Sequence, residues 1–372
     1  MEFIDLKSQQ NQEISNGINL KDQINSNISK VLDHGKYILG PEVKEIEVLL
    51  AKYVGVKHCI AVSSGTDALL IAMLALDIKK GDEIITTPFS FMATAETISL
   101  LGAIPVFVDI DKVTYNLDSS QIEKAITNRT KAIIPVSLYG QPANFKVINE
   151  IAKKYGLPVI EDGAQSFGST HYGLKSCSLS TIGTTSFFPS KPFGGYGDSG
   201  ACFTDDDELA LKMREISKHG QSKRYFHTKL GVNGRMDTIQ AAILLAKFPL
   251  FPFEVKQREK IALKYNYKLL NGGFKNIPIV TKGNTSVYAQ YTILVEDRNR
   301  IQGYLNDKGV PTSIHYPMLL SNQPALSEKY ISHDTKVALD KSRKVLSLPM
   351  HPWLSENDQD KVVFNLLRAL DL

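Results

Sequence analysis

The feature that most constrains the fold is an alternation of short apolar runs with helical patterns between residue 40 and about residue 205. Near-continuous apolar strands separated by helices are typical of a parallel sheet that is covered on both faces. The runs expected to be strands are residues 59–64, 83–88, 105–110, 132–139, 158–162, 184–188 and 200–204. We therefore predict an α/β fold built on a mainly parallel sheet.

Helices are expected between these strands, because the intervening segments carry apolar residues at helical spacing. Gly40 and Pro41 precede one such segment, and a proline at the first helical position has a preset φ. The other expected helices are residues 65–76, 93–101, 120–126, 145–155, 207–218 and 236–248. Strand and helix thus follow each other in regular order, as in a sheet with helical crossovers.

The second part of the chain has a different pattern. Pro249 and Pro252 interrupt the apolar helix, and a long charged helix follows. Residues 288–295 alternate like a half-buried antiparallel strand, and helices are expected at 299–308 and 358–370. We predict two domains: a large α/β domain (15–250) and a smaller C-terminal α+β domain (251–372), with residues 1–14 packing as an arm.

The composition excludes several classes of protein. With 372 residues, 43% hydrophobic and 22% charged, the chain resembles an ordinary globular protein rather than a disordered one. A net charge of +4 is too small to indicate nucleic-acid binding. The cysteines Cys59, Cys177 and Cys202 are odd in number and form no CxxC, so neither a disulfide framework nor a metal site is expected.

The N-terminus lacks the charged and apolar regions of a signal peptide, and apolar runs such as residues 69–76 are too short to span a bilayer. The expectation is a soluble, reduced, cytoplasmic protein that has no membrane partner.

Polar segments follow several predicted strands, at the edge where open α/β sheets bind ligands. Residues 63–66 (Ser-Ser-Gly-Thr) lie between a strand and a helix, where backbone N–H groups suit a phosphate. The simpler interpretation is an ordinary helix N-cap. Glu161 and Asp162 close another strand, and a carboxylate there could bind a cation or a protonated ring nitrogen, or could only cap a helix or form a salt bridge.

Lys191 lies in a glycine-rich loop between two predicted strands. Most lysines are solvated surface charges, but a partly desolvated lysine loses proton affinity and can attack an aldehyde. A further polar loop, residues 231–236, precedes the apolar helix and could be a plain turn. A phosphate cradle, a carboxylate, an amine and an extra polar loop are together what pyridoxal phosphate requires of a protein.

The chain resembles the DegT/DnrJ/EryC1/StrS family of sugar aminotransferases over nearly its whole length, with the motifs in the same order and spacing. The motifs are FIDLKSQ (3–9), GPEVKEIE (40–47), SSGTDAL (63–69), EDGAQSFG (161–168), SFFPSKPFGGYGDSGA (186–201), HGQSKRY (219–225), GVNGRMDTIQAA (231–242) and HYP (315–317). The resemblance implies the fold-type-I architecture of pyridoxal-phosphate-dependent aminotransferases and pyridoxal 5′-phosphate as cofactor.

The resemblance also implies which residues form the site. Lys191 would bond covalently to the cofactor and then move a proton, and Asp162 would pair with the pyridine nitrogen. Gln165 would reach the 3-hydroxyl side of the ring, and Phe91 would stack on the ring unless it is an ordinary core aromatic. The expected cofactor-binding residues are Gly65, Thr66, Phe91, Asp162, Gln165, Ser186, Lys191 and Asn233.

Members of this family form homodimers with shared active sites. By resemblance, Asn233 would reach the partner's phosphate group and Arg235 would line the partner's substrate pocket. His315 and Tyr316 would contact substrate from the small domain, although a histidine in a capped turn remains an open alternative.

Two details of the motifs refine this expectation. The family's glycine run often reads GEGG or GDGG, whereas here Ser199 occupies one glycine position. A branch of the family has histidine in place of the lysine and dehydrates its substrate, so Lys191 argues against that branch.

The sequence around Lys191 is closest to the form associated with 3-keto nucleotide sugars. The nearest resemblance is to aminotransferases that make UDP-2-acetamido-3-amino-2,3-dideoxyglucuronate for bacterial surface polysaccharide, with glutamate as amino donor in a ping-pong reaction. Lys223, Arg224, Arg235 and His315 are candidate cations for such an acidic substrate. A 4-keto nucleotide sugar, a dTDP-3-keto-6-deoxyhexose or a non-catalytic regulatory role remain alternatives.

Overall fold

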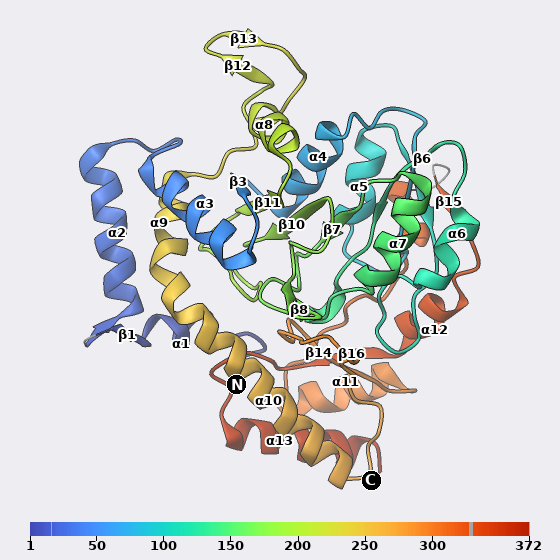
Figure 1. Cartoon of the computed structure of the whole chain (residues 1–372). Helices are drawn as coiled ribbons and strands as arrows, with labels where there is room; N and C mark the ends of the chain where they lie inside the picture. Colours follow the sequence, from blue (N-terminus) through green and yellow to red (C-terminus); the bar gives the residue numbers. More distant parts are fainter. Residues whose placement is uncertain (16, 327–329, 372) are drawn as a thin grey trace.

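The computed structural model describes residues 1–15, 17–326 and 330–371. At its centre lies a twisted sheet surrounded by helices (Figure 1). In spatial order its strands are β3 (His58–Val62), β11 (Gly200–Thr204), β10 (Ile182–Ser186), β7 (Ile160–Asp162), β6 (Thr130–Ile134), β4 (Glu83–Thr86), β5 (Ile104–Phe107) and β15 (Ile331–Ser332). Parallel bridges from Ile133 to Val159 and from Val136 to Asp162 join its two halves. In this sheet β11 is antiparallel to both neighbours, and the other recorded pairings are parallel.

Most residues of the sheet strands are buried because each face is covered by helices. Successive side chains of a strand point to opposite faces. In β3, Ile60 and Val62 join a core with α4 and α8, whereas Cys59 and Ala61 join a second core with α3 and α9. The covering helices are α3 (Pro41–Val54), α4 (Gly65–Ala75), α5 (Ala93–Leu100), α6 (Ile122–Ala125), α7 (Phe145–Tyr155), α8 (Asp207–Ile216) and α9 (Thr238–Lys247). The predicted α/β class with a mainly parallel sheet is confirmed.

The C-terminal part of the chain has its own apolar core, which contains buried residues from Ile261 to Ala369. The predicted antiparallel strand is β14 (Tyr291–Leu294), and its partner is β16 (Val345–Leu348). The helices of this part are α10 (Phe251–Asn271), α11 (Arg298–Asp307), α12 (Lys336–Lys344) and α13 (Glu356–Ala369). The chain nevertheless returns to the large sheet through β15, so the domain division at residues 250 and 251 stays a prediction.

The N-terminal residues lie against α10 and the segment after β16. The backbone N–H of Met350 donates to the carbonyl of Phe3, and the side-chain amide of Gln9 donates to Glu254. The elements that follow are α1 (Leu6–Gln10), β1 (Glu13–Ser15), β2 (Ile18–Asn19) and α2 (Leu20–His34). The helix α2 is not among the helices predicted above, and it lies beside α9 in Figure 1.

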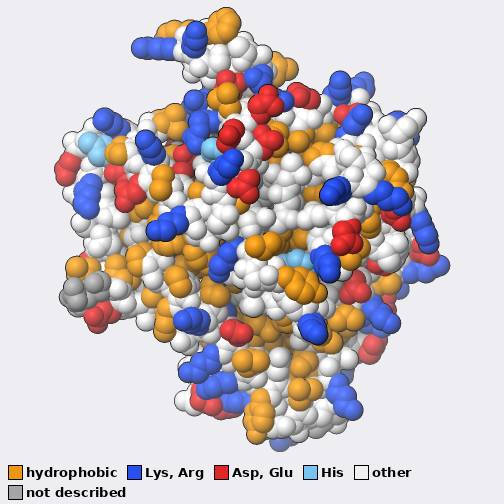
Figure 2. Space-filling view, viewed as in Figure 1, with side chains coloured by type: hydrophobic (Ala, Val, Ile, Leu, Met, Phe, Trp, Pro, Cys, Tyr) orange, Lys and Arg blue, Asp and Glu red, His pale blue; other side chains and the backbone are white. Residues whose placement is uncertain are grey.

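A hairpin of β12 (Gln221–Lys223) and β13 (Phe226–His227) projects from the body at the top of Figure 1. Figure 2 shows basic and hydrophobic side chains together on this projection. The remaining short elements are β8 (Thr170–His171), β9 (Leu174–Lys175), η1 (Ser119–Gln121), η2 (Leu138–Gly140), η3 (Phe248–Leu250), η4 (Leu320–Asn322) and η5 (Pro324–Leu326).

One helical stretch, Thr238–Asn271, is long and apolar enough to cross a membrane by length and composition alone. It consists of α9, η3 and α10, and 56% of its most apolar window is buried inside the fold. Burial of this kind is what a core helix of a globular protein shows.

Candidate active site

A cavity of about 480 Å³ lies at the carboxyl ends of the sheet strands. Its walls come from segments that follow β3, β4, β6, β7 and β10, and from two segments of the C-terminal part. Its lining residues are Ser64, Gly65, Thr66, Leu69, Ser90, Phe91, Ala93, Thr94, Val136, Asp162, Ala164, Gln165, Ser186, Phe188, Ser190, Lys191, Asp198, Gln290, His315 and Tyr316. The structure thus brings most of the predicted site residues into one cavity, at the edge where open α/β sheets bind ligands.

Asp162 ends β7 and is buried in the cavity wall. Desolvation raises the pKa of its carboxyl group, whereas a hydrogen bond from Thr94, another from Ala164 and the charge of Lys191 oppose that rise. The Thr94 hydroxyl donates to Oδ2 at 2.8 Å, and the Ala164 N–H donates to Oδ1 at 3.2 Å. An acid held in this way can pair with a cationic nitrogen in the cavity.

Lys191 faces the same cavity from the glycine-rich loop between β10 and β11. Desolvation lowers the pKa of its amine, and the charge of Asp162 partly opposes this effect. A lowered pKa increases the neutral fraction of the amine, which is the nucleophilic form. The geometry therefore supports a lysine that attacks an aldehyde in the cavity.

The N-terminus of α4 points into the cavity and can hold an anion. Ser64 is the N-cap, and its Oγ accepts a hydrogen bond from the Asp67 N–H at 3.0 Å. There is no room for a side chain at Gly65, because a Cβ there would lie 2.6 Å from the Cβ of Ser186. The glycine lets the helix end approach β10, so that the free N–H groups and the Ser186 hydroxyl line one wall.

Gln165 is buried and fixed in orientation. Its Oε1 accepts from the backbone N–H of Tyr139 at 2.8 Å, and its Nε2 donates to the Tyr316 hydroxyl at 3.1 Å. The Tyr316 ring lies 6.3 Å from the ring of Phe91, centroid to centroid. Phe91 is 55% exposed, so it is not an ordinary core aromatic, and its face is available to a ligand.

His315 lies in the cavity wall with its Nδ1 2.9 Å from the hydroxyl of Ser347. Its ring stacks on Phe3 at 6.1 Å. Burial, followed by the charge of Lys191, lowers the pKa of His315 to about 4. The imidazole is therefore neutral near pH 7, so it can form hydrogen bonds to a substrate but does not supply the positive charge expected of it as a candidate cation.

Asn233 and Arg235 do not line this cavity. They lie in a loop that runs beside the end of β3, where Ser63 donates its N–H to the carbonyl of Gly234 at 3.1 Å. Lys223 and Arg224 lie on the projecting hairpin and are exposed. The roles predicted for these four residues toward a partner subunit stay predictions.

Sequence reasoning missed several polar lining residues, among them Thr94, Asp198 and Gln290. Thr94 holds Asp162, Asp198 lies in the glycine-rich loop, and Gln290 has a buried Oε1 without a hydrogen-bond partner. Thr94 lies about one helical turn after Phe91, and this spacing is a sequence signal that could have placed Thr94 in the cavity wall. Gln290 gave no local signal, because it enters the cavity from the distant C-terminal part.

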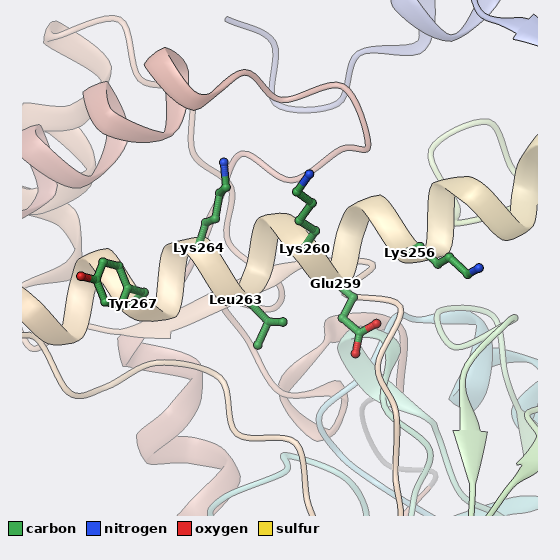
Figure 3. Close-up of a pocket in the computed structure, with 6 residues that line it drawn as sticks. All are labelled: Lys256, Glu259, Lys260, Leu263, Lys264 and Tyr267. Atoms are coloured by element: carbon green, nitrogen blue, oxygen red, sulfur yellow. The ribbon is translucent and has the colours of Figure 1, made fainter.

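Other sites offer less chemistry. A surface hollow of about 380 Å³ is lined by residues of α10 alone, and Figure 3 shows that their side chains diverge: Lys256, Glu259, Lys260, Leu263, Lys264 and Tyr267. In the described residues no group of three or more His, Cys, Asp or Glu side chains could hold a metal ion, and the three cysteines are free and buried.

The chain is similar in sequence to known sugar aminotransferases. The chain matches the DegT/DnrJ/EryC1/StrS aminotransferase family over residues 19–367. It is 54% identical to the UDP-2-acetamido-2-deoxy-3-oxo-D-glucuronate aminotransferase of Pseudomonas aeruginosa over 354 residues, which cover 95% of this chain and 96% of that protein.

Solved structures agree with the fold. A DegT DnrJ EryC1 StrS aminotransferase from Brucella abortus matches with a TM-score of 0.94 and 40% identity, covering 100% of this chain and 99% of the other. NtdA from Bacillus subtilis, solved with bound cofactor PMP, matches with a TM-score of 0.88 and 34% identity, covering 100% and 90%.

Proposed function

This chain belongs to the DegT/DnrJ/EryC1/StrS aminotransferase family, and from that premise we propose its substrate and the roles of its residues. It is an aminotransferase that depends on pyridoxal 5′-phosphate. We propose that it transfers the amino group of glutamate to UDP-2-acetamido-2-deoxy-3-keto-glucuronate and so forms the 3-amino sugar. The observation that carries this proposal is the 54% identity to the Pseudomonas aeruginosa enzyme over 95% of the chain.

The cavity fits the cofactor on structural grounds. The missing Cβ of Gly65 leaves the end of α4 free to hold a phosphate, together with Thr66 and Ser186. Asp162 is a buried carboxyl group on which the charge of Lys191 acts. An additional cationic partner, such as a protonated pyridine nitrogen, would stabilise its charged form.

The proposed chemistry of the chain follows from these contacts. When bound, pyridoxal phosphate supplies the aldehyde that carries the amino group and a ring that takes up electron density. Lys191 would bind the aldehyde through Nζ and later move a proton at the substrate carbon that exchanges the amino group. Asp162 would keep the ring nitrogen protonated, and Gln165 and Phe91 would orient the ring.

An acidic nucleotide sugar needs positive charge that this cavity holds only in part. Lys191 and His315 are the basic side chains of its lining, and His315 is neutral near pH 7. We propose that Arg235, with Lys223 or Arg224, supplies the remaining charge from a second copy of the chain, and that Asn233 reaches the partner's phosphate. Exposed apolar side chains on and beside the hairpin, including Leu230 at 90% exposure, support a homodimer.

The substrate is tested by product mass. Purified holoenzyme is incubated with glutamate and a panel of 3-keto and 4-keto nucleotide sugars, and the products are analysed by mass spectrometry. Conversion of the 3-keto glucuronate in preference to the others supports the proposal. Preference for a 4-keto sugar or a dTDP-3-keto-6-deoxyhexose would replace the proposed substrate, and binding of the nucleotide sugar without turnover would indicate a regulatory protein.

The shared site is tested by mixing inactive variants. Lys191→Ala removes the reactive amine of one site, and Arg235→Ala removes the group proposed to act in the partner's site. If each site combines both chains, unfolding and refolding an equal mixture restores about a quarter of wild-type activity, because half of the dimers contain one intact site. No recovery, or a monomer in ultracentrifugation, would contradict the shared site.

We also propose that the enzyme acts in the cytoplasm and supplies an amino sugar for bacterial surface polysaccharide, such as lipopolysaccharide O-antigen. The globular fold and the nucleotide-sugar relative support this setting. Deleting the gene and comparing the monosaccharides of the surface polysaccharide would test it.

A further inference from the structure

A second cluster of buried charges lies behind the loop that carries Lys191. Lys247, in the last turn of α9, is 2% exposed, and Glu254 of α10 is also 2% exposed. Arg258, one turn further along α10, is 5% exposed. Charged side chains are almost never buried to this extent without a specific partner, so the contacts of this cluster have to account for its position.

Lys247 contacts the loop directly. Its Nζ donates a hydrogen bond to the carbonyl oxygen of Gly194 and lies 4.7 Å from the centroid of the Tyr196 ring. Burial lowers the pKa of this amine to about 8, and the charge of Glu254 opposes the shift. Near pH 7 the group is therefore mainly an ammonium ion aimed at the backbone of the loop.

Two other contacts help to hold the loop. Phe193 is buried against other aromatic rings of the core, and the Tyr196 N–H donates to Oε1 of Gln240 at 3.1 Å, beside the carbonyl that Lys247 contacts in this loop. The loop forms no helix or strand between β10 and β11. Lys191 donates its N–H to the carbonyl of Phe188 at 2.9 Å, and Gly195 donates to the carbonyl of Phe187 at 2.7 Å. A Cβ on Gly194 would lie 2.5 Å from the carbonyl oxygen of Pro189, which shows how tightly the turn is folded. The hydrogen bond from Lys247 to the Gly194 carbonyl therefore acts three residues from Lys191, within this tightly folded turn.

Glu254 and Arg258 form hydrogen bonds with distant segments of the chain. Gln9 donates its side-chain amide to Glu254, and Arg258 donates to the carbonyls of Tyr288 at 3.3 Å and Met350 at 3.4 Å. A small cavity of about 20 Å³, enough for one water molecule, lies between these groups and Lys191. Lys191 therefore lines both the large front cavity and this small rear one.

We propose that Lys247, with Glu254 as its buried counter-charge, is a positioning residue that holds the Gly194 carbonyl and so aims Lys191 at the cofactor cavity. This inference rests on the proposed function, because it assumes that Lys191 bonds to pyridoxal phosphate. The alternative is a purely structural role, in which the ammonium ion only stabilises the C-terminus of α9 through the helix dipole.

The test compares Lys247→Met with a matched control, Lys175→Met. Lys175 makes the same kind of contact elsewhere: its Nζ lies 4.7 Å from the ring centroid of Tyr53 and 3.3 Å from the carbonyl oxygen of Gly168. The holoenzymes are reconstituted with pyridoxal phosphate. Visible circular dichroism per bound cofactor, kcat and KM for glutamate, and Tm are then measured.

For Lys247→Met we expect a changed circular dichroism signal and a kcat about 10- to 100-fold lower, because small misplacements of a reacting group are costly. KM for glutamate should stay within about twofold, since the substrate pocket is unchanged. Lys247→Arg, which keeps a donor and a charge, should recover most of the loss. Lys175→Met should lower only Tm.

A Lys247→Met holoenzyme with wild-type dichroism and kcat but lower Tm would overturn the inference in favour of the structural role. If this variant does not fold, Glu254→Gln decides: a changed dichroism and a lower kcat support the inference, and wild-type values of both refute it. If wild-type protein shows no absorption band from lysine-bound cofactor, the proposed function fails instead, so the two failures are distinguishable.

Discussion

The two sides of the Lys191 loop make an informative comparison. In front, Lys191 faces Asp162; behind, Lys247 accompanies Glu254. Desolvation lowers the pKa of both lysines and raises the pKa of both carboxyl groups. The electrostatic character of the two pairs is therefore similar, although we assign the chemistry to one pair and a positioning role to the other.

Space and hydrogen bonding separate the two pairs. The front pair opens on a cavity of about 480 Å³, and within the described part of the chain no group is recorded as accepting a hydrogen bond from the Lys191 amine. The rear pair adjoins a cavity of about 20 Å³, and the Lys247 amine is bonded to Gly194. A shifted pKa alone does not identify a reactive lysine; free space in front of the amine is also needed.

The largest effect should come from Lys191→Ala. Removing the amine that we propose bonds to the cofactor should lower the rate of the glutamate half-reaction at least about a thousandfold. The absorption band of lysine-bound cofactor should also be absent. A variant that kept the band, or that lost no more activity than Lys247→Met, would break the distinction between the front and rear lysines.

Asp162→Asn should have the next largest effect. A neutral amide does not hold a proton on the ring nitrogen, so kcat should fall about 100- to 1000-fold at unchanged cofactor occupancy. Glu254→Gln is the matched change at the rear carboxyl group and should cost less. If Asp162→Asn and Glu254→Gln lower the single-turnover rate equally, the two carboxyl groups do not have the different roles that we assign to them.

Thr94→Val should move the acid limb of the pH–rate profile. The Thr94 hydrogen bond favours the charged form of Asp162 and lowers its pKa, so its removal raises that pKa. The carboxylate is then protonated at a higher pH, and activity should be lost roughly one pH unit earlier on acidification. Thr97→Val, which breaks a hydrogen bond to Ala93 in the same helix, should leave the limb in place.

The smallest effect concerns Glu161, buried beside Asp162. Burial raises its pKa to about 7, despite hydrogen bonds from Ser176 and Cys177. Because the folded state binds this proton more tightly than the unfolded state, the stability it contributes is present below about pH 4.5 and is lost as pH rises through about 7. Glu161→Gln resembles the protonated form.

Thermal unfolding at about pH 5 and about pH 8 tests whether the stability contributed by Glu161 falls as pH rises. Wild-type Tm should fall more than the Tm of Glu161→Gln over this interval, by a few degrees. A larger fall in the variant would contradict the raised pKa. Glu161 also serves as a reference for Asp162 and Glu254, because it is a buried carboxyl group on which neither Lys191 nor Lys247 is found to act.

Much of the large sheet could be predicted because its signals are local. The expected helix at 145–155 is α7, and the expected strand at 200–204 is β11, each at the predicted bounds. The helix α2 was missed, although Leu20, Ile24 and Val31 lie at helical spacing on its buried face. Its otherwise polar sequence concealed that pattern.

Long-range pairings could not be predicted in this way. The two-residue strand β15 pairs with β5, more than two hundred residues earlier in the chain. A segment so short has no periodicity of its own, and its partner is chosen by the exposed edge of an already formed sheet. The position of Gln290 in the cavity has the same cause, because it depends on how the C-terminal part is placed.

By itself, the sequence determined the α/β class and the set of residues at the ends of the strands, because apolar periodicity and loop motifs are local properties of the chain. Only the tertiary structure decided which charges are buried together. Lys247 and Glu254 lie in a proline-interrupted helical stretch where nothing marks them as partners, since the cost of burying a charge depends on groups brought in from elsewhere. Gly194, which accepts from Lys247, and Gln9, which donates to Glu254, are those groups, and they meet only in the folded chain.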